Sequence, residues 1–556
     1  MVRLQPMDLT SLRAVLAELR PLLVPSRFEK AQQSSPSSLQ IGLRHLQGLQ
    51  WLEISWQPEA ARVHAIPSPP RQGEGSTLAQ QLQHGLRGLA LTRITQPPWE
   101  RVVDLGFSRR PQEPDERRLV VELMGRHSNL FLLDGDGRVI ALARQVKPEQ
   151  SRLRPIGTGD LYRAPPPLTG TPPSLEEPFE RWQQRLQLLP LTLDQALQDA
   201  YQGISPALIR QLLPAGSARQ SVLEATPGQW LEIWKRWQSW LQTLQQEHFH
   251  WEDLGEGYCC WQPTPNAAPA QGPMVINQAM ARYYGAHLTA RTFQEQRRRL
   301  GERVERLVSR EATMALEQEQ LLATAPDSDH LQAQADALLS QQEPTRQCID
   351  TAQKLYRRAR KLRRSVAAIT PRLAQHRERH AALEASIVYL EQAENLEQLQ
   401  SLEQEINDLS GQRPAQGAKG RRRDKTQPGP PRPLVLNTPR GLAVQIGRNH
   451  HQNEWIALRQ ARRGDLWFHA QELPGSHVVL KSSQAHAEDA DLQWAADLAA
   501  HFSRGRANGK VPVLMVPVEE LQRIPGAAAG TVRHRGGQVL WGVPERALVL
   551  LAKISA

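Results

Sequence analysis

The chain has 556 residues, too many for one hydrophobic core, so we expect three or four domains. Its 68 Lys and Arg against 57 Asp and Glu give a formal net charge of +11, which favours polyanionic partners, nucleic acid before an anionic membrane, although heavy use of arginine alone would leave the same excess. Three cysteines, two of them adjacent, exclude a disulfide framework and a four-ligand zinc site, while a start without a signal-peptide core and the lack of roughly 20 consecutive apolar residues favour a cytosolic protein with no membrane partner.

Residues 1–165 have the pattern of an α+β domain. Apolar residues at helical spacing follow Asp8, a residue type that caps helix N-termini. Asp134–Gly137 lies between two apolar runs and predicts a hairpin turn, and the proline-rich stretch Ala164–Ser174 ends the domain. The predicted strands are Leu39–Leu43, Gly48–Ser55, Ala90–Ile94, Arg101–Leu105, Arg118–Met124 and Leu130–Leu133.

Residues 175–245 are predicted to be helical, with tryptophans on the apolar faces. Within them, Tyr201–Leu213 has the pattern of a helix-hairpin-helix, whose turn can present backbone N–H groups to a phosphate; a plain helical hairpin fits the same residues. Two runs that look extended, Gly255–Trp261 and Pro273–Ile276, are candidates to complete the first domain over residues 250–279.

Residues 280–410 are predicted to form an antiparallel coiled-coil hairpin. Apolar residues recur at alternating spacings of three and four, as in Leu362, Val366, Ile369 and Leu373, and again in Leu399, Leu402, Ile406 and Leu409. Breaks are expected near residues 325–329 and 342–345, and Pro371 predicts a local kink.

The last part of the chain divides into a linker and a compact domain. Residues 411–433 combine proline, glycine and charge without apolar anchors and predict a flexible basic linker. Residues 434–556 are predicted to be α+β, with one helix over Ala485–Arg504. The expected strands are Ala443–Ile446, Trp455–Leu458, Leu466–His469, His477–Leu480, Val511–Val516 and Val539–Trp541.

The usual signatures of an active site are missing from the sequence, since it has no P-loop, dinucleotide-binding, zincin or serine-hydrolase motif. We therefore expect a protein that is not an enzyme and needs no cofactor. A cluster of six cations within eight residues is instead the clearest chemical feature, because like charges at this spacing destabilise an isolated helix and suit a polyanion nearby. A solvated coiled-coil face is the alternative. The cluster consists of Arg357, Arg358, Arg360, Lys361, Arg363 and Arg364.

Two further segments combine aromatic, imidazole, arginine and amide side chains. One is Met124–Asn129, after an apolar strand; the other comprises Gly447–Asn453 and Leu466–His477. Such side chains recognise looped or single-stranded RNA by stacking and hydrogen bonding. Each could equally be structural, with Trp467 in a core and the histidines as satisfied polar groups.

These motifs resemble the NFACT family, and within it the bacterial RqcH-type factors that were formerly labelled fibronectin-binding proteins. Met-Gly-Arg-His-Ser-Asn at Met124–Asn129 resembles the hallmark of the family's N-terminal domain. Gly447–Asn453, Asp465–His469 and Pro474–Val479 are similar to its RNA-binding domain. The resemblance covers essentially the whole chain. It implies an N-terminal domain like that of formamidopyrimidine glycosylases, a helix-hairpin-helix domain, a coiled-coil arm and a C-terminal RNA-binding domain.

The resemblance also implies a function. Family members bind a stalled large ribosomal subunit that still holds peptidyl-tRNA, and contact its rRNA. They recruit alanyl-tRNA, and the subunit's own peptidyl-transferase centre then adds alanines without a template, which marks the nascent chain for degradation. We expect this chain to bind the stalled subunit and to direct alanine addition in the same way, as a monomer on the subunit.

Site residues carry over by position. The family's tRNA-recruiting positions match Asp8, the pair Glu100 and Arg101 (where an Asp-Arg pair is usual), Arg126 and His127. The expected RNA contacts of the last domain are Arg448, Asn449, Trp467, His469 and His477. The sequence departs from the family at Leu82–Gly85, where a basic element is usual, and between Leu339 and Leu355, where the hairpin end is short.

Three other functions are weighed against this one. A DNA glycosylase would need an N-terminal catalytic proline and usually a zinc finger, and neither is present. An extracellular matrix-binding adhesin would need a signal peptide and a wall anchor. A general ribosome- or RNA-binding structural protein without tailing activity fits the same residues, and only a functional test separates it from the leading interpretation.

Overall fold

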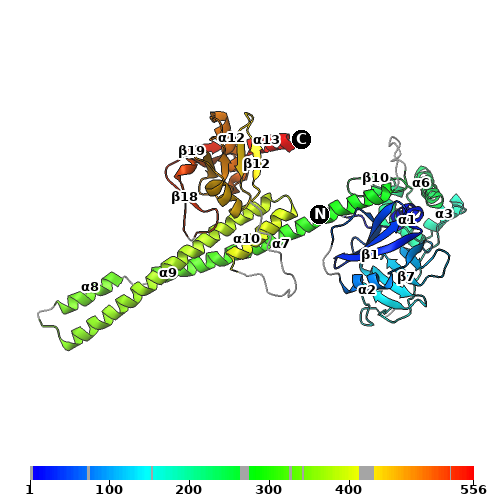
Figure 1. Ribbon diagram of the computed structural model, residues 1–556, viewed down its shortest axis with the longest axis horizontal. Coiled ribbons are helices and arrows are strands. Elements are labelled where there is room, and N and C mark those ends of the chain that lie inside the picture. The colour runs from blue at the N-terminus through cyan, green and yellow to red at the C-terminus, as the bar shows by residue number, and fades with distance from the viewer. Residues whose placement is uncertain are drawn as a thin grey trace. The chain divides into compact units, whose positions relative to one another are not determined.

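The computed structural model describes residues 4–71, 76–151, 154–262, 274–324, 328–340, 343–411, 431–525 and 527–555 (Figure 1). The chain divides into two compact units, Met1–Thr289 and Ala290–Ala556. Both contain helices and sheet, so the predicted multi-domain α+β class is confirmed at that level, whereas the resemblance to glycosylase N-domains stays a prediction. No helix in the described ranges is both long and apolar enough to cross a bilayer.

The first unit is built on a nine-stranded antiparallel sheet. Strands β1 to β4 form one half of it and β5 to β9 the other, so that β1 lies beside β5 (Figure 1). The helix α1 (Leu9–Leu23) contributes Leu12, Leu16 and Leu19 to the core of this unit. The strands are β1 (Ser26–Ser35), β2 (Ser38–His45), β3 (Gly48–Ser55), β4 (Arg62–Ile66), β5 (Ala90–Thr95), β6 (Val102–Ser108), β7 (Arg117–Glu122), β8 (Asn129–Asp134) and β9 (Val139–Leu142).

All six predicted strands of this region lie within or overlap strands of the sheet, and the predicted hairpin turn is confirmed. The Asp134 carboxylate accepts hydrogen bonds from the N–H groups of Asp136 (3.0 Å) and Arg138 (2.8 Å), and Gly137 has a φ of 80°. A left-handed residue at this point is what a tight turn requires, and glycine adopts it without steric cost.

A helical layer follows the sheet in sequence. Its helices are α3 (Phe179–Leu186), α4 (Leu193–Ala200), α5 (Pro206–Leu212) and α6 (Pro227–Gln246). Trp182, Trp230, Trp237 and Trp240 are fully buried in their common core. The turn between α4 and α5 packs on the first domain, since a Cβ at Gly203 would lie 2.7 Å from Leu9. Two short helices joined by a turn are present as expected, but a phosphate-binding role for this turn stays a prediction.

The segment before the long helices differs from its prediction. The strands β10 (Glu252–Asp253) and β11 (Tyr258–Cys259) pair only with each other, although Tyr258 is buried in the core of the first unit. Residues 274–276 were expected to be extended, which is wrong, because helix α7 (Val275–Thr324) already begins at Val275.

One carboxylate explains where α7 begins. Glu18 of α1 accepts hydrogen bonds from the backbone N–H of Ile276 (2.9 Å), the backbone N–H of Asn277 (3.0 Å) and the Asn277 side-chain amide (2.8 Å). The first turn of a helix leaves its N–H groups without intrahelical partners, and an anionic acceptor satisfies them. The contact with Glu18, which the local sequence pattern does not reveal, therefore favours a helix where the local residues alone favour an extended backbone.

Removing this acceptor should destabilise the first unit. We expect Glu18→Ala to lower the free energy of unfolding by about 2 kcal/mol, because two backbone N–H groups and an amide lose their partner. Thermal denaturation of the full chain measures this against Glu149→Ala, which removes an exposed carboxylate. Equal melting temperatures for the two variants would show that Glu18 does not anchor α7.

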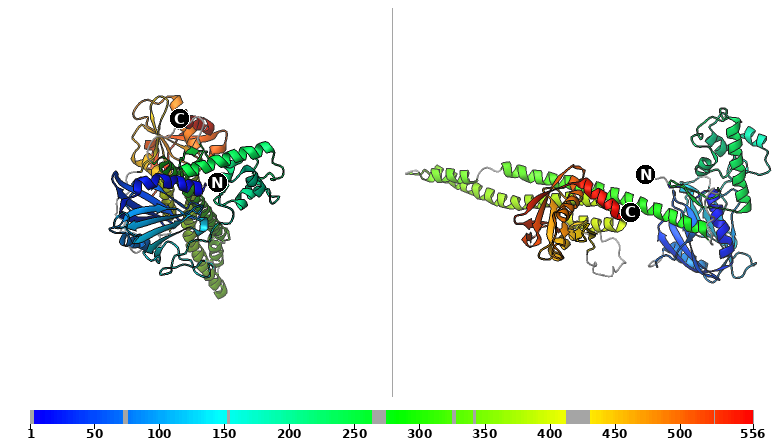
Figure 2. Two further views of the ribbon diagram at one scale, coloured as in Figure 1. Left: turned by 90° about the vertical axis from the view of Figure 1, so that its right-hand side faces the viewer. Right: turned by 90° about the horizontal axis from the view of Figure 1, so that it is seen from above.

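The second unit begins with a helical hairpin. After α7 come α8 (Ser328–Leu339), α9 (Arg346–Gln392) and α10 (Leu396–Leu409). Arg363 of α9 binds Asp329 of α8 (2.8 Å), and nearer the base Arg377 binds Glu319 of α7 (2.6 Å). As residue numbers rise along α9, the numbers of the partner residues fall. Helix α9 therefore runs antiparallel to α7 and α8, as predicted (Figure 2).

The packing seam of the hairpin matches most of its predicted heptad residues. Leu399, Leu402, Ile406 and Leu373 are buried and Leu362 and Ile369 are half-buried, whereas Val366 is 38% exposed. At the far end the seam instead consists of small residues: Ala335, Ala352 and Ala359. The expected breaks agree with the ends of α7 and α8 and with the Thr345 cap of α9, although 325–327 and 341–342 lie outside the described residues. Helix α9 continues through Pro371.

The C-terminal domain has a six-stranded antiparallel sheet in the order β12-β13-β15-β14-β16-β19. Its strands are β12 (Leu434–Asn437), β13 (Ala443–Ile446), β14 (Leu466–Ala470), β15 (Val478–Leu480), β16 (Val511–Pro517) and β19 (Gln538–Gly542). Helices α12 (Asp489–His501) and α13 (Pro544–Ser555) pack on one face. The other face carries α11 (His450–Glu454), the helical turn Trp455–Arg459 and the hairpin of β17 (Leu521–Arg523) and β18 (Val532–His534). Of the predicted linker 411–433, residues 412–430 lie outside the described ranges.

One predicted strand of this domain is wrong. Trp455–Leu458 is helical and continues directly from α11. Its apolar run looked extended, but Asn449 caps the preceding helix by accepting from Gln452 N–H, and Ile456 and Ala457 enter the core on the face away from α12. The Asn449 cap starts helix α11 before the apolar run begins, and the run continues as helix.

Candidate nucleic-acid interface

Three of the predicted tRNA-recruiting residues gather at one end of the nine-stranded sheet. Arg101 directly precedes β6, and its carbonyl accepts a hydrogen bond from Leu123 N–H at the end of β7 (2.9 Å). The next turn of chain, the 3-10 helix Gly125–His127, holds Arg126 and His127, which are exposed and joined by a 3.0 Å hydrogen bond between Nε and Nε2. We call Arg101, Arg126 and His127 the sheet-end cluster.

The Arg101 guanidinium has no ion-pair or hydrogen-bonding partner among the described residues, and it is half-exposed. Its neighbour Glu100 accepts a hydrogen bond from Leu168 N–H (3.3 Å). Burial raises the pKa of the Glu100 carboxyl, while the Leu168 N–H and the nearby Arg101 charge lower it. An unsatisfied planar donor fork at the surface is suited to a phosphate or a base edge.

Asp8 caps a helix, as its residue type predicts, and its role in tRNA recruitment stays a prediction. It is 6% exposed and caps α1, accepting from the N–H (2.9 Å) and hydroxyl (2.6 Å) of Ser11. Its second oxygen accepts from the hydroxyl of Ser205, the cap of α5, at 2.6 Å. Asp8 thus joins two helix N-termini across the seam between the sheet and the helical layer. This position argues against a direct contact with RNA and for a role in holding the seam.

Two residues beside this cluster, Arg13 and Trp99, are not indicated by any sequence motif. The Arg13 guanidinium lies over the Trp99 ring at 5.4 Å, and Trp99 packs against Trp240 of the helical layer. Trp99 has a φ of 62°, which is costly for a bulky residue and is maintained only by surrounding contacts. These contacts direct Trp99 inward, immediately before Glu100 and Arg101.

The departure at Leu82–Gly85 has a structural explanation. It falls in α2 (Thr77–Gly85), where Leu82 is buried. The Gln83 side chain accepts from Ala31 N–H (2.8 Å) and donates to the Glu29 carbonyl, so it holds α2 against β1. A neutral amide makes both bonds at once, which a lysine or arginine cannot, because neither has an acceptor.

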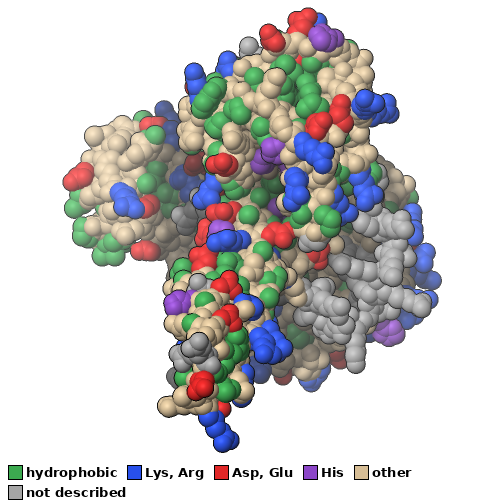
Figure 3. Space-filling view, turned by 90° about the vertical axis from the view of Figure 1, so that its left-hand side faces the viewer, with side chains coloured by type: hydrophobic (Ala, Val, Ile, Leu, Met, Phe, Trp, Pro, Cys, Tyr) green, Lys and Arg blue, Asp and Glu red, His purple; other side chains and the backbone are tan. Residues whose placement is uncertain are grey.

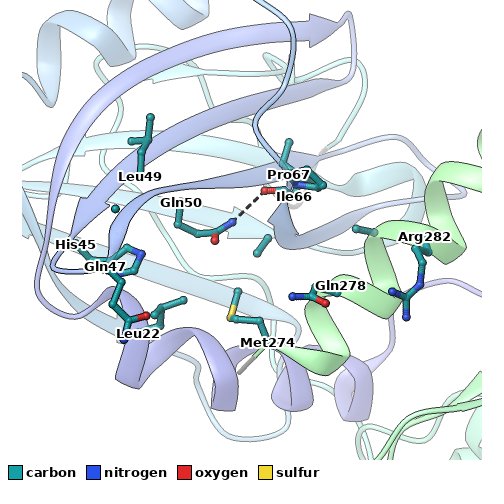
Figure 4. A pocket seen from close by; sticks show the side chains of 13 residues that line it. Leu22, His45, Gln47, Leu49, Gln50, Ile66, Pro67, Met274, Gln278 and Arg282 are labelled. Atoms are coloured by element: carbon teal, nitrogen blue, oxygen red, sulfur yellow. Dashed lines mark hydrogen bonds between the residues drawn. The ribbon is translucent and has the colours of Figure 1, made fainter. Parts of the chain in front are cut away.

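The first unit also has an open pocket of about 680 Å³ beside the β2–β3 hairpin (Figure 4). Apolar side chains such as Leu49 and Met274 line it together with the amides of Gln50 and Gln278, and Gln50 donates to the Ile66 carbonyl (3.0 Å). None of the predicted site residues lines this pocket. No group of three His, Cys, Asp or Glu side chains within the described ranges could hold a metal ion.

All six cations of the basic cluster of α9 are exposed. Since a helix turns by about 100° per residue, Arg357, Arg360, Lys361 and Arg364 share one face, opposite the buried Ala352 and Ala359. Arg358 and Arg363 flank that face, and Arg363 turns back to bind Asp329. The cluster therefore presents four cations outward rather than six, and none of the four has an acidic partner in the described part of the chain.

The predicted RNA contacts of the C-terminal domain are mostly interior. Trp467 is 3% exposed and lies against His469 and His477, with ring centroids 5.6 and 5.0 Å away. Asn449 is buried as the cap of α11 and donates to Ser401 (3.1 Å), while Arg448 is bound to Glu394 (2.8 Å). The aromatic and amide groups are used for packing and capping, which argues against direct base contacts by these residues, His469 excepted because it is partly exposed.

The segment around His450 instead joins the C-terminal domain to the hairpin. The His450 ring contacts the Ala382 carbonyl (2.9 Å) and the Ser386 hydroxyl (3.2 Å) of α9. Tyr389 donates to the Gly475 carbonyl (3.1 Å) and accepts from the Asn453 amide (2.8 Å). Glu405 of α10 accepts from the N–H groups of His450 and His451, both at 3.1 Å. We call these contacts the hairpin junction.

Burial makes the histidines of this region weak bases. It lowers the pKa of His450 to about 4 and that of His469 to about 4, and it holds the pKa of His477 well below its usual range, with the nearby His469 adding to the effect. In the same junction, burial raises the pKa of the Glu405 carboxyl. The folded domain therefore requires neutral imidazoles.

The C-terminal domain should lose stability as the pH falls from about 6.5 to about 4. The unfolded chain binds protons at these histidines that the folded domain excludes, so the free energy of unfolding should drop by up to about 1.4 kcal/mol per pH unit for each histidine. Hydrogen exchange of β14 and β15, corrected for intrinsic rates, measures the change. His450→Gln should remove about one proton from the dependence and His534→Gln, at an exposed site, should not. Protection that stays constant over this window would contradict the prediction.

Comparison with known proteins covers nearly the whole chain. Residues 8–347 and 341–425 match the family model of the NFACT N-terminal and middle domains, and residues 433–536 match that of the NFACT protein RNA binding domain. These matches include the sheet-end cluster, most of the hairpin and the hairpin junction.

Relatives of similar length are found in several bacteria. The chain is 25% identical to the Rqc2 homolog RqcH of Streptococcus pneumoniae, over 96% of this chain and 97% of that protein. It is 24% identical to the Rqc2 homolog RqcH of Bacillus subtilis, over 97% and 98%. The solved C-terminal part of the fibronectin/fibrinogen-binding protein from Streptococcus suis is 27% identical, covers 45% of this chain and 95% of its own, and superposes with a TM-score of 0.39.

Proposed function

The chain belongs to the NFACT family, and on this premise we propose that it is a ribosome-associated quality control factor. It binds large ribosomal subunits that retain peptidyl-tRNA, recruits a tRNA, alanyl-tRNA in our proposal, and directs template-free addition of alanine to the stalled chain. The protein works in the cytoplasm, as a monomer on the subunit. The subunit's own peptidyl-transferase centre supplies the chemistry, so the protein itself is a positioning factor and not an enzyme.

The observation that carries this proposal is that each unit bears its own basic surface, within a chain that matches the family along its length. Four cations of α9 point away from the packing seam without acidic partners among the described residues. The sheet-end cluster belongs to the other unit and includes Arg101, whose guanidinium has no partner in the described part of the chain. We assign rRNA to the α9 surface and tRNA to the sheet-end cluster.

Asp8 and Glu100 act in this proposal by position. Asp8 joins α1 to α5, and Glu100, directly before Arg101, is tied to the Leu168 backbone. The carboxylates also repel phosphates that approach without the correct geometry. The longer side chain of Glu100, where an Asp is usual in the family, is accommodated by the bond to Leu168.

The α9 surface should dominate the salt dependence of subunit binding. We expect the change of Arg357, Arg360, Lys361 and Arg364 to Gln to weaken cosedimentation with large subunits. It should also reduce the slope of the log binding constant against log salt by about three, because counterions are released for each phosphate contact that forms and the variant forms fewer of them. The matched control changes Arg110, Arg181, Arg219 and Lys235, four exposed cations of the first unit, to Gln. If both variants lower the slope equally, the α9 cluster is only a solvated face.

Arg101 should be needed for tRNA and not for the subunit. We expect Arg101→Ala to reduce tRNA copurification at least about tenfold, and tailing with it. Cosedimentation with large subunits and the melting temperature should stay unchanged, because the Arg101 guanidinium makes no hydrogen bond or ion pair with the described residues. Arg138→Ala, at the opposite end of the sheet, is the control. Sequencing the bound RNA identifies the tRNA.

Two outcomes would count against the assignment. A parallel loss of tRNA, subunit binding and melting temperature in Arg101→Ala would make Arg101 structural. Asp8→Asn is the reference for that pattern, because it weakens a buried cap. Subunit binding without any enriched tRNA in the unaltered chain would favour a ribosome-binding structural protein without tailing activity.

A further inference from the structure

The edge strand β19 exposes two large apolar side chains. It pairs only with β16, and its other edge is open among the described strands. Val539 is 47% exposed and Trp541 is 58% exposed, while the alternate residue Leu540 packs into the core beneath α12. Because side chains alternate along a strand, Val539 and Trp541 lie on the sheet face opposite α12.

Neighbouring strands extend this apolar surface. Trp541 pairs with Pro512 and Val539 pairs with Leu514 on β16, and Leu514 pairs in turn with His469 on β14. Pro512, Leu514 and His469 are each partly exposed, and His469 stacks on the buried Trp467 with an interplanar angle of 11°. We call His469, Pro512, Leu514, Val539 and Trp541 the β19 platform. An exposed aromatic beside apolar neighbours on an open edge marks an interaction surface rather than a solvated one.

The rim of the platform is basic. Lys510 immediately precedes β16, at the end where Trp541 lies. Arg533 and Arg535 belong to the β17–β18 hairpin and the turn after it, and this hairpin lies on the same face because Leu521 and Val532 pack there. All three cations are exposed, and none has an ion pair in the described part of the chain. Figure 3 shows hydrophobic side chains gathered on one face of the molecule, with Lys, Arg and some acidic side chains among them.

We propose that the β19 platform binds single-stranded RNA, with an unpaired base stacked on Trp541, the adjacent phosphate held by Lys510 and phosphates further along the strand held by Arg533 and Arg535. The inference rests on the proposed function and specifies how the C-terminal domain takes part in it. Aromatic faces beside cations are suited to unpaired bases, whereas a duplex keeps its base faces stacked and offers mainly phosphates and sugars. The rim favours a polyanion over an apolar protein segment or a second copy of the chain.

This site differs from the one that the motifs suggested. Trp467 and His477 are interior, so stacking on RNA falls to an aromatic residue further along the chain. The match to the NFACT protein RNA binding domain ends at residue 536, so it includes His469, Pro512, Leu514 and the basic rim but not Val539 and Trp541.

The test measures binding of the full chain to a fluorescent oligouridylate, an oligoadenylate and an RNA duplex of equal length, by anisotropy over a series of salt concentrations. Affinities of different RNAs and variants are compared at the same salt concentration. We expect the single strands to bind more tightly than the duplex, and Trp541→Ala to weaken their binding about tenfold while Trp541→Phe largely restores it. The matched control is Leu548→Ala, which truncates a side chain of similar exposure on α13, on the other face of the same domain. Arg533→Gln with Arg535→Gln should flatten the salt dependence without removing the preference for single strands.

The outcomes separate this inference from the proposed function. Unchanged oligonucleotide binding in Trp541→Ala, an equal loss in Leu548→Ala, or equal affinity for the duplex would overturn the platform. A change of oligomeric state on Trp541→Ala, measured by light scattering and without loss of RNA binding, would overturn it in favour of a contact between copies. Cosedimentation of the unaltered chain with large subunits tests the proposed function separately, because the oligonucleotide assay contains no ribosomal subunits.

Discussion

Burial of polar groups at the hairpin junction is the constraint on which the second unit depends. Tyr389, His450 and Glu405 lose their hydration there, and each is compensated by a partner on the other element. An unsatisfied buried group would cost about 1–3 kcal/mol, so the C-terminal domain and the base of the hairpin are stable together in one arrangement. This fixes α11, and with it the loops at that end of the domain, relative to α9 and α10. Motif residues that look like RNA ligands are therefore used for packing and hydrogen bonding within the fold.

Much of the fold could be predicted from local pattern. Strong alternation predicted β3, Asp-Gly pairs predicted the β8–β9 turn, and the heptad residues of α10 predicted its buried face. Strand β1 could not be predicted, because its sequence is polar and its register shifts twice. Gln32 is buried in it only because Gln40 and the Pro70 carbonyl accept its amide hydrogens. The start of α7 was missed for the same kind of reason, since its acceptor, Glu18, lies more than two hundred residues away.

The sequence indicates what a candidate site residue offers where its side chain is accessible, but not where capping or core packing uses that side chain. Arg101, Arg126 and the α9 cations are exposed, so residue type alone indicates what they offer to a polyanion. Asp8 and Trp467 carry equally suggestive side chains, but helix capping and core packing account for them, and only the tertiary structure shows this. Trp541 was overlooked for the opposite reason. In an apolar strand it looks like core, and its exposure follows from β19 being the last strand of the sheet.

The alanine seam at the far end of the hairpin has a dynamic consequence. Each alanine buries about three carbons fewer than a leucine, which removes roughly 2 kcal/mol of burial free energy per position. The helices around Ala335, Ala352 and Ala359 are therefore held together much more weakly than those around Leu383 and Leu390. Local opening should begin at the tip and rarely reach the base. The cations are thus carried on the most compliant part of the hairpin, where the helix can adjust its track to the spacing of the phosphates it meets.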